Sequence, residues 1–141
     1  MSQSSIFYPV FAQVMLTFLV LTMMAVKRMR SLRDGELKIK DIALGQSNWP
    51  EEVTKVSNNF RNQFELPMLF YVVSVFSFML QKSTGVFLLL AWGFVISRMW
   101  HSYIHITNNY VPKRAYIYFI GCIILFAMWV ILCAQLLYEG F

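Results

Sequence analysis

Polar residues with helical spacing precede the second long apolar run of the chain: Asn58, Arg61, Asn62 and Glu65. Their i, i+3, i+4 and i+7 positions would gather them on one side of a helix. Pro67 lacks a backbone donor and is expected to kink that helix just after Glu65. Arg61 and Glu65 could pair only with each other, but arginine before glutamate is the weaker order for an i, i+4 pair. We therefore expect this polar stripe to line a cavity that binds a ligand.

A second polar set with helical spacing lies later in the chain: Arg98, His101, His105 and Asn108. It forms one polar face on an otherwise apolar helix. His101 and His105 have the i, i+4 spacing of a two-histidine metal site, which Glu65 could complete. A closed zinc site would need a fourth ligand. Hydrogen-bonded histidines between helices are therefore the favoured alternative, and no metal is expected.

A third polar set opens the last apolar run, in the segment "YVPKRAYIY". Pro112 suits a loop or a first helical turn, and Tyr118 lies one turn beyond Arg114. An arginine and tyrosine belt at the membrane interface would explain this set alone. Three polar sets near one side of the membrane favour a shared binding site.

The composition indicates the class of protein that positions these sets. Hydrophobic residues make up 58% of the 141 residues, and charged residues only 13%. These values lie outside the usual soluble range and indicate a single-domain integral membrane protein, residues 1–141. Apolar runs of about 20 residues indicate helices long enough to cross a hydrocarbon core of roughly 30 Å. The expected spans of this all-α, four-helix bundle are 6–26, 58–80, 84–106 and 115–138.

The basic residues predict the orientation of these spans. The first loop, 27–57, and the turn between the third and fourth spans contain nearly all of them: Lys27, Arg28, Arg30, Arg33, Lys38, Lys40, Lys55, Lys113 and Arg114. The opposite side has only Lys82. The positive-inside rule places both loops in the cytoplasm and both termini outside it, in the cell membrane. The net charge of +5 then points to anionic lipid headgroups or an anionic substrate rather than nucleic acid.

Several motifs resemble one known family. The basic first loop, "RNQFELP" before the second run, "RMWHSYIH" in the third and "VPKRAYIY" before the fourth are similar to those of the MAPEG superfamily. That family comprises membrane-associated proteins in eicosanoid and glutathione metabolism. The resemblance covers the whole chain and is nearest to an uncharacterised bacterial branch, which implies the bacterial inner membrane. It also implies four-helix protomers that assemble as a homotrimer.

The resemblance implies a glutathione site between neighbouring protomers. Its cofactor-binding residues would be Arg28 or its neighbour Lys27, Arg61, Asn62, Glu65, Arg98, His105 and Tyr118, with Arg114 as the catalytic residue that stabilises the thiolate. Guanidinium groups bind carboxylates in bidentate pairs, which suits the two carboxylates of the tripeptide. The implied activity is a glutathione transferase or peroxidase that acts on lipophilic electrophiles or lipid hydroperoxides reaching the site from the bilayer.

Two positions depart from the family pattern. His105 stands where several glutathione-using members have tyrosine, and Ala115 follows Arg114 where the prostaglandin E synthases have serine. Prostaglandin synthesis is therefore not expected. The family also includes a non-enzymatic lipid-presenting protein, so a non-catalytic lipid-binding or partner-binding scaffold is the main alternative. A metal-dependent oxidoreductase using His101, His105 and Glu65 is a third reading.

Overall fold

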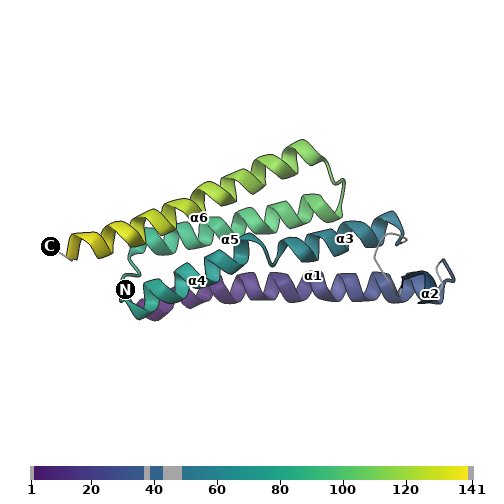
Figure 1. Ribbon diagram of the computed structural model, residues 1–141, viewed down its shortest axis with the longest axis horizontal. Helices are drawn as coiled ribbons and strands as arrows, with labels where there is room; N and C mark the ends of the chain where they lie inside the picture. The colour runs from purple at the N-terminus through teal and green to yellow at the C-terminus, as the bar shows by residue number, and fades with distance from the viewer. Residues whose placement is uncertain (1, 37–38, 43–48, 140–141) are drawn as a thin grey trace.

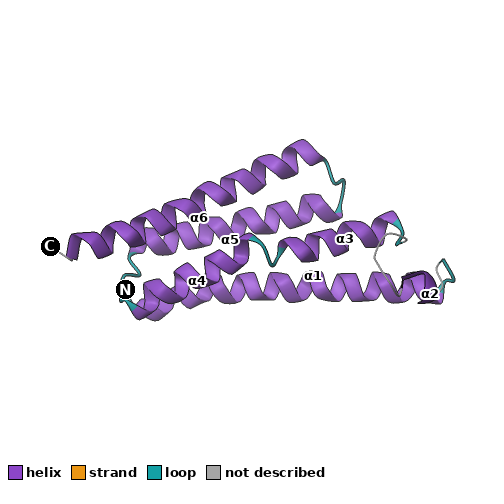
Figure 2. Ribbon diagram, viewed as in Figure 1, coloured by secondary structure: helices purple, strands orange, loops and turns teal. Residues whose placement is uncertain are grey.

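The computed structural model shows an all-helical bundle and describes residues 2–36, 39–42 and 49–139 (Figure 1). The element order is η1 (Gln3–Ile6), α1 (Phe7–Arg33), α2 (Ile39–Ile42), α3 (Glu51–Asn62), α4 (Leu66–Met79), α5 (Gly85–Ile106) and α6 (Val111–Glu139). Figure 2 shows helices joined by short turns, with no strand in the described part of the chain. The expected first loop, 27–57, lies partly outside the described residues, and so does its Lys38.

Three helices are long and apolar enough to cross a membrane among the residues that the structure describes. They are Gln3–Arg33, Gly85–Ile106 and Val111–Tyr138. The expected spans at 6–26 and 115–138 fall within two of these helices, and the span at 84–106 matches the third except that Thr84 is its N-cap. The expected span at 58–80 instead comprises the end of α3, a break, and the 14 residues of α4. The chain is a multi-pass membrane protein.

Local sequence signals set the helix ends. Thr84 caps α5 by accepting a hydrogen bond from the Phe87 backbone at 3.3 Å. Gly35 adopts a φ of 74° directly after α1, which glycine does without a steric penalty. Asn109 adopts a φ of 49° after α5, and asparagine tolerates this left-handed conformation better than most residues. This turn lets α6 return along α5.

Two apolar clusters hold the bundle together. The larger joins η1, α4, α5 and α6 and includes Phe70 and Phe94, whose rings stack at a centroid distance of 4.6 Å. The smaller lies between α1 and α3 and contains Val20, Met24 and Val56. The start of α1 and the end of α6 lie at the same end of the bundle, while α2 and the α5–α6 turn lie at the other (Figure 1).

Candidate functional site

A helix break lies at the centre of the expected polar stripe. α3 ends at Asn62 and α4 begins at Leu66, with Pro67 in its first turn. In one continuous helix, the Pro67 ring would clash with the carbonyl of Gln63, four residues earlier. At the start of a new helix the missing proline donor costs nothing, because first-turn donors have no helical partner. The kink expected after Glu65 is therefore a full break over residues 63–65, which includes Glu65.

The break corrects the predicted stripe. The expectation that its four residues share one side of a single helix is wrong, because Glu65 lies beyond the end of α3. Three of the four side chains are exposed and Asn62 is half-buried: Asn58, Arg61, Asn62 and Glu65.

Arg98 is the most deeply buried charged residue at the break. Its side chain, on α5, is 0% exposed. Its Nη2 donates to the backbone oxygen of Asn62 at 3.4 Å, a carbonyl that the end of α3 leaves without a helical partner. The guanidinium lies 5.4 Å from the centre of the Tyr118 ring. The Arg98 Nε and Nη1 atoms are buried and have no hydrogen-bond partner.

Glu65 supplies a carboxylate near this buried cation. When the Asn62 amide nitrogen faces Glu65, it donates to both carboxylate oxygens, at 3.2 and 3.3 Å. Asn62 thus connects the two groups, by its backbone oxygen to Arg98 and by its side chain to Glu65. The edge of the break presents a carboxylate and an amide, and its interior a guanidinium.

His105 and Asn109 position Arg114 at the α5–α6 turn. The Arg114 Nη1 atom lies 3.2 Å from His105 Nε2 and also donates to Asn109 Oδ1. Arginine has only donors, so His105 Nε2 must accept and the imidazole proton must lie on Nδ1. The helix-ending turn at Asn109 thereby fixes the direction of the Arg114 side chain.

An aromatic row joins the two arginines. The His101 ring lies 5.8 Å from the His105 ring and 5.7 Å from the Tyr118 ring, between centroids. His101 and His105 are both 2% exposed, and the Nδ1 atom of each has no hydrogen-bond partner. The row places Arg98 and Tyr118 at one end and Arg114 at the other. The sequence suggested His101 as a metal ligand or as a hydrogen-bonded histidine between helices, and its ring contacts with His105 and Tyr118 were not predicted.

Arg28 and Arg61 lie in a separate pocket between α1 and α3. The pocket has a volume of about 290 Å³ and is lined by Met24, Arg28, Ser57, Phe60, Arg61 and Phe64. Arg28 Nη2 donates to Ser57 Oγ at 3.1 Å, and its guanidinium lies over the Trp49 ring at 5.2 Å. Among the described residues, no hydrogen bond or ion pair joins this pocket to Arg98 or Arg114. The expected site residues therefore form two groups within one protomer.

A buried amide network behind the break was not predicted. Gln63 Nε2 donates to Ser102 Oγ at 3.0 Å and to Asn59 Oδ1 at 3.3 Å, while Gln13 donates to Gln63 Oε1 at 3.0 Å. Ser102 Oγ donates to Asn59 Oδ1 at 3.1 Å. Asn59 and Gln63 are four residues apart, so the same helical spacing rule could have identified this inward face. The network joins α1, α3 and α5 directly beneath the break.

The geometry does not support a metal site formed by His101, His105 and Glu65. Within residues 2–36, 39–42 and 49–139, no group of three His, Cys, Asp or Glu side chains is placed to hold a metal ion. The two buried histidines face Tyr118 and Arg114 instead of a third ligand. A buried guanidinium with unpaired donors is suited to an anion.

Comparison with known proteins identifies the family. The MAPEG family model matches residues 6–134, which covers every residue of the two groups described above. Neither the curated proteins nor the solved structures include a match to this chain. The chain therefore belongs to the MAPEG family, the membrane proteins of eicosanoid and glutathione metabolism.

Proposed function

We propose that this protein binds glutathione at the helix break and acts as a transferase or peroxidase on lipophilic electrophiles or lipid hydroperoxides. The observation that carries the proposal is Arg98, a fully buried guanidinium with two unpaired nitrogen atoms. A guanidinium stays charged, and the Asn62 backbone oxygen and the Tyr118 ring leave two of its buried nitrogen atoms unpaired, which costs free energy. An anionic ligand would remove that cost.

Glutathione fits the donor set around Arg98. It has two carboxylates, which arginine side chains bind well, and one ammonium, which a carboxylate binds. Arg98 would hold a carboxylate, and Tyr118 would cover the guanidinium face opposite the ligand. Glu65 and Asn62 would bind the ammonium and amides. Glu65 is exposed and Asn62 half-buried at the break, which leaves both accessible to a small molecule.

Arg114 is the proposed catalytic residue. Glutathione supplies a thiol that reacts as the thiolate, and a fixed cation favours that form. His105 and Asn109 both contact Nη1 of Arg114, so Nη2 and Nε have no partner in the described part of the chain. Arg114 would stabilise the sulfur charge, while His105 keeps the guanidinium oriented.

We also propose four membrane crossings, with α3 and α4 together forming the second. This count is supported by the start of α1 and the end of α6, which lie at one end of the bundle (Figure 1). Three crossings would separate them. By the positive-inside rule, the loop 27–57 and the α5–α6 turn would face the cytoplasm and both termini the other side of the cell membrane.

A homotrimer would unite the two groups of site residues. The pocket with Arg28 and Arg61 does not contact the Arg98 cluster within one protomer, whereas glutathione in this family lies between protomers. A trimer would bring the pocket of one protomer against the cluster of the next. This arrangement would give one ligand access to all four arginines, including Arg114.

Glutathione binding can be tested by calorimetry on detergent-purified protein. We expect saturable binding by the wild type and its loss in Arg114→Ala and in Glu65→Ala. The matched control is Arg33→Ala, since Arg33 is exposed and pairs only with Asp34 at 3.3 Å in the described structure. Absence of binding by a wild-type protein that retains its oligomeric state would refute the proposal.

One observation favours a second candidate, a non-catalytic lipid-binding or partner-binding scaffold. Arg114 is already bound by His105, at a position where glutathione-using relatives have tyrosine. If the chain itself satisfies this arginine, the thiol is not needed. If the protein is a scaffold, we expect a stable oligomer that retains lipid through purification. Calorimetry should then detect no heat of glutathione binding.

A further inference from the structure

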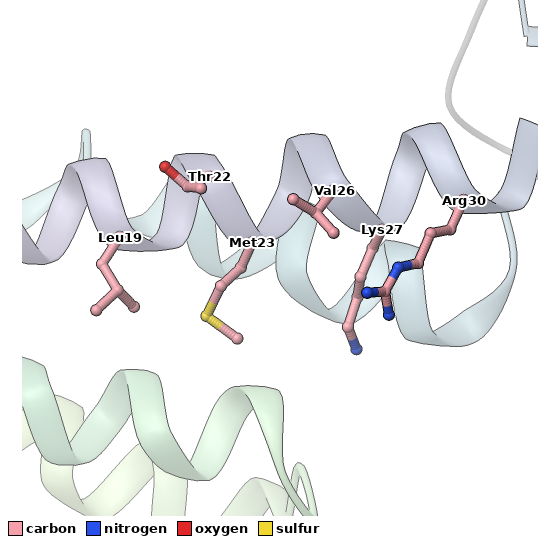
Figure 3. A pocket seen from close by; sticks show the side chains of 6 residues that line it. All are labelled: Leu19, Thr22, Met23, Val26, Lys27 and Arg30. Atoms are coloured by element: carbon pink, nitrogen blue, oxygen red, sulfur yellow. The ribbon is translucent and has the colours of Figure 1, made fainter.

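A hollow of about 490 Å³ runs along one face of α1 and lies outside the site described above. It is lined by Leu19, Thr22, Met23, Val26, Lys27 and Arg30. These positions recur at helical spacing, so one stripe of α1 forms the whole lining. Figure 3 shows Leu19, Met23, Lys27 and Arg30 pointing from α1 toward the side where the green ribbons of the second half of the chain lie, whereas Thr22 points away from it.

The lining changes from apolar to cationic along its length. Leu19, Met23 and Val26 are apolar, and the two cations lie at the end nearest the first loop. Eleven residues separate Leu19 from Arg30, which is about 16 Å of helix at 1.5 Å per residue. That length is close to one leaflet of a hydrocarbon core of roughly 30 Å. The hollow therefore has the depth and polarity of a single lipid leaflet.

At the cationic end, the described residues supply fewer anions than cations. Lys27 is bound to Glu52 at 2.8 Å. Arg30 has no hydrogen bond or ion pair to any described residue. Figure 3 shows the Lys27 and Arg30 side chains directed toward the same end of the hollow. Two cations and one carboxylate leave a place for one further negative charge.

We propose that this hollow binds one anionic phospholipid of the surrounding bilayer. Its phosphate lies between Lys27 and Arg30, and one acyl chain runs along Val26, Met23 and Leu19. An anionic phospholipid complements the charge of Lys27 and Arg30. A second copy of this chain is a poorer source of that negative charge, because its own net charge is +5. The lipid site is distinct from the proposed glutathione site, which uses none of these residues.

Lipid titration followed by native mass spectrometry tests this site. The probe is phosphatidylglycerol added to the detergent-purified protein, with phosphatidylcholine as the zwitterionic comparison. Arg30→Gln should weaken phosphatidylglycerol binding about fivefold, since a cation at a membrane surface is worth roughly 1 kcal/mol. Met23→Trp should also weaken it by filling the acyl channel. The matched control Arg33→Gln, an exposed arginine outside the hollow, should bind like the wild type.

Three outcomes would overturn the proposal. Equal losses in Arg30→Gln and Arg33→Gln would indicate diffuse charge attraction, and equal binding of phosphatidylcholine would remove the headgroup argument. Disulfide formation between copies of Thr22→Cys, with Cys122 and Cys133 replaced by alanine, would show that a second protomer covers the hollow. Glutathione calorimetry on Arg30→Gln should match the wild type, so failure at one site is distinguishable from failure at the other.

Discussion

Single residues set the polar interior of this bundle, and Gln63 is the clearest example. It is 1% exposed and lies just past the last residue of α3. Its amide contacts Gln13, Asn59 and Ser102 at once. Such contacts between membrane helices average roughly 0.6 kcal/mol and reach roughly 1.7 kcal/mol each. One side chain therefore ties three helices together beneath the proposed glutathione site.

Replacing Gln63 with leucine should destabilise the protein by about 1–3 kcal/mol, because the buried Gln13 amide loses its partner and Asn59 retains only its bond from Ser102. The double substitution Gln13→Leu and Gln63→Leu should recover part of this loss, since fewer polar atoms then remain unpaired. Thermal unfolding in detergent measures both effects. Ser74→Ala is the matched control, because Ser74 is buried and its hydroxyl has no partner. A Gln63→Leu protein as stable as this control would contradict the network's role.

The sequence predicts the helices of this protein better than their interruption. Apolar length is a local property, so the run at 84–106 leads directly to α5, Gly85–Ile106. The break before Leu66 depends on a clash between Pro67 and a carbonyl four residues earlier, and proline alone can kink a helix without ending it. The inward turn of Asn59 follows from packing against α5, which composition does not encode. The sequence could therefore indicate which polar residues lie near the break, but not which faces of the helices they occupy.

Close contact between α5 and α6 depends on Gly121. A Cβ at this position would lie 2.9 Å from Ser97 Oγ, so either the Ser97 hydroxyl must leave its hydrogen bond to the Phe94 backbone or the helices must separate. We expect Gly121→Ala to cost about 1–3 kcal/mol in unfolding free energy, and Ser97→Ala in the same chain to restore most of it. Gly93→Ala is the control, since its Cβ would lie 3.6 Å from the Ile124 side chain, an ordinary contact. Equal thermal stability of the two alanine variants would refute this account.

The contact between α1 and α3 should respond to acid through Glu52. Hydrogen bonds from Lys27 and Lys55 lower the pKa of this exposed carboxyl below its ordinary value. A lowered folded-state pKa contributes stability above the unfolded-state pKa, and that stability is lost as the pH falls through the folded-state value. Unfolding measured between neutral and acidic pH should therefore show that the protein loses stability as the pH falls. The loss should be smaller in Glu52→Gln. If stability depended on pH identically in the wild type and in Glu52→Gln, Glu52 would be excluded as the source of the acid-dependent loss.

At the scale of the whole molecule, the path of α3 and α4 decides the topology. If they cross the membrane together, the α4–α5 turn lies opposite both Arg33 and the α5–α6 turn. If only the three long apolar helices cross, Arg33 and the α4–α5 turn share one side. Single cysteines at Arg33, Gln81 and Asn108, with Cys122 and Cys133 replaced by alanine, distinguish the two arrangements. All three positions are exposed.

We expect a membrane-impermeant thiol reagent, applied from the cytoplasmic side of inverted vesicles, to label Arg33→Cys and Asn108→Cys but not Gln81→Cys. The physical reason is that α4, although only 14 residues long, continues the direction of α3 past the break (Figure 1). The combined path can then span a core that 14 residues, about 21 Å of helix, cannot span alone. Detergent permeabilisation should expose Gln81→Cys and serves as the control. Labelling of Arg33→Cys and Gln81→Cys from the same side would leave the helix break, and the site built on it, at the membrane surface.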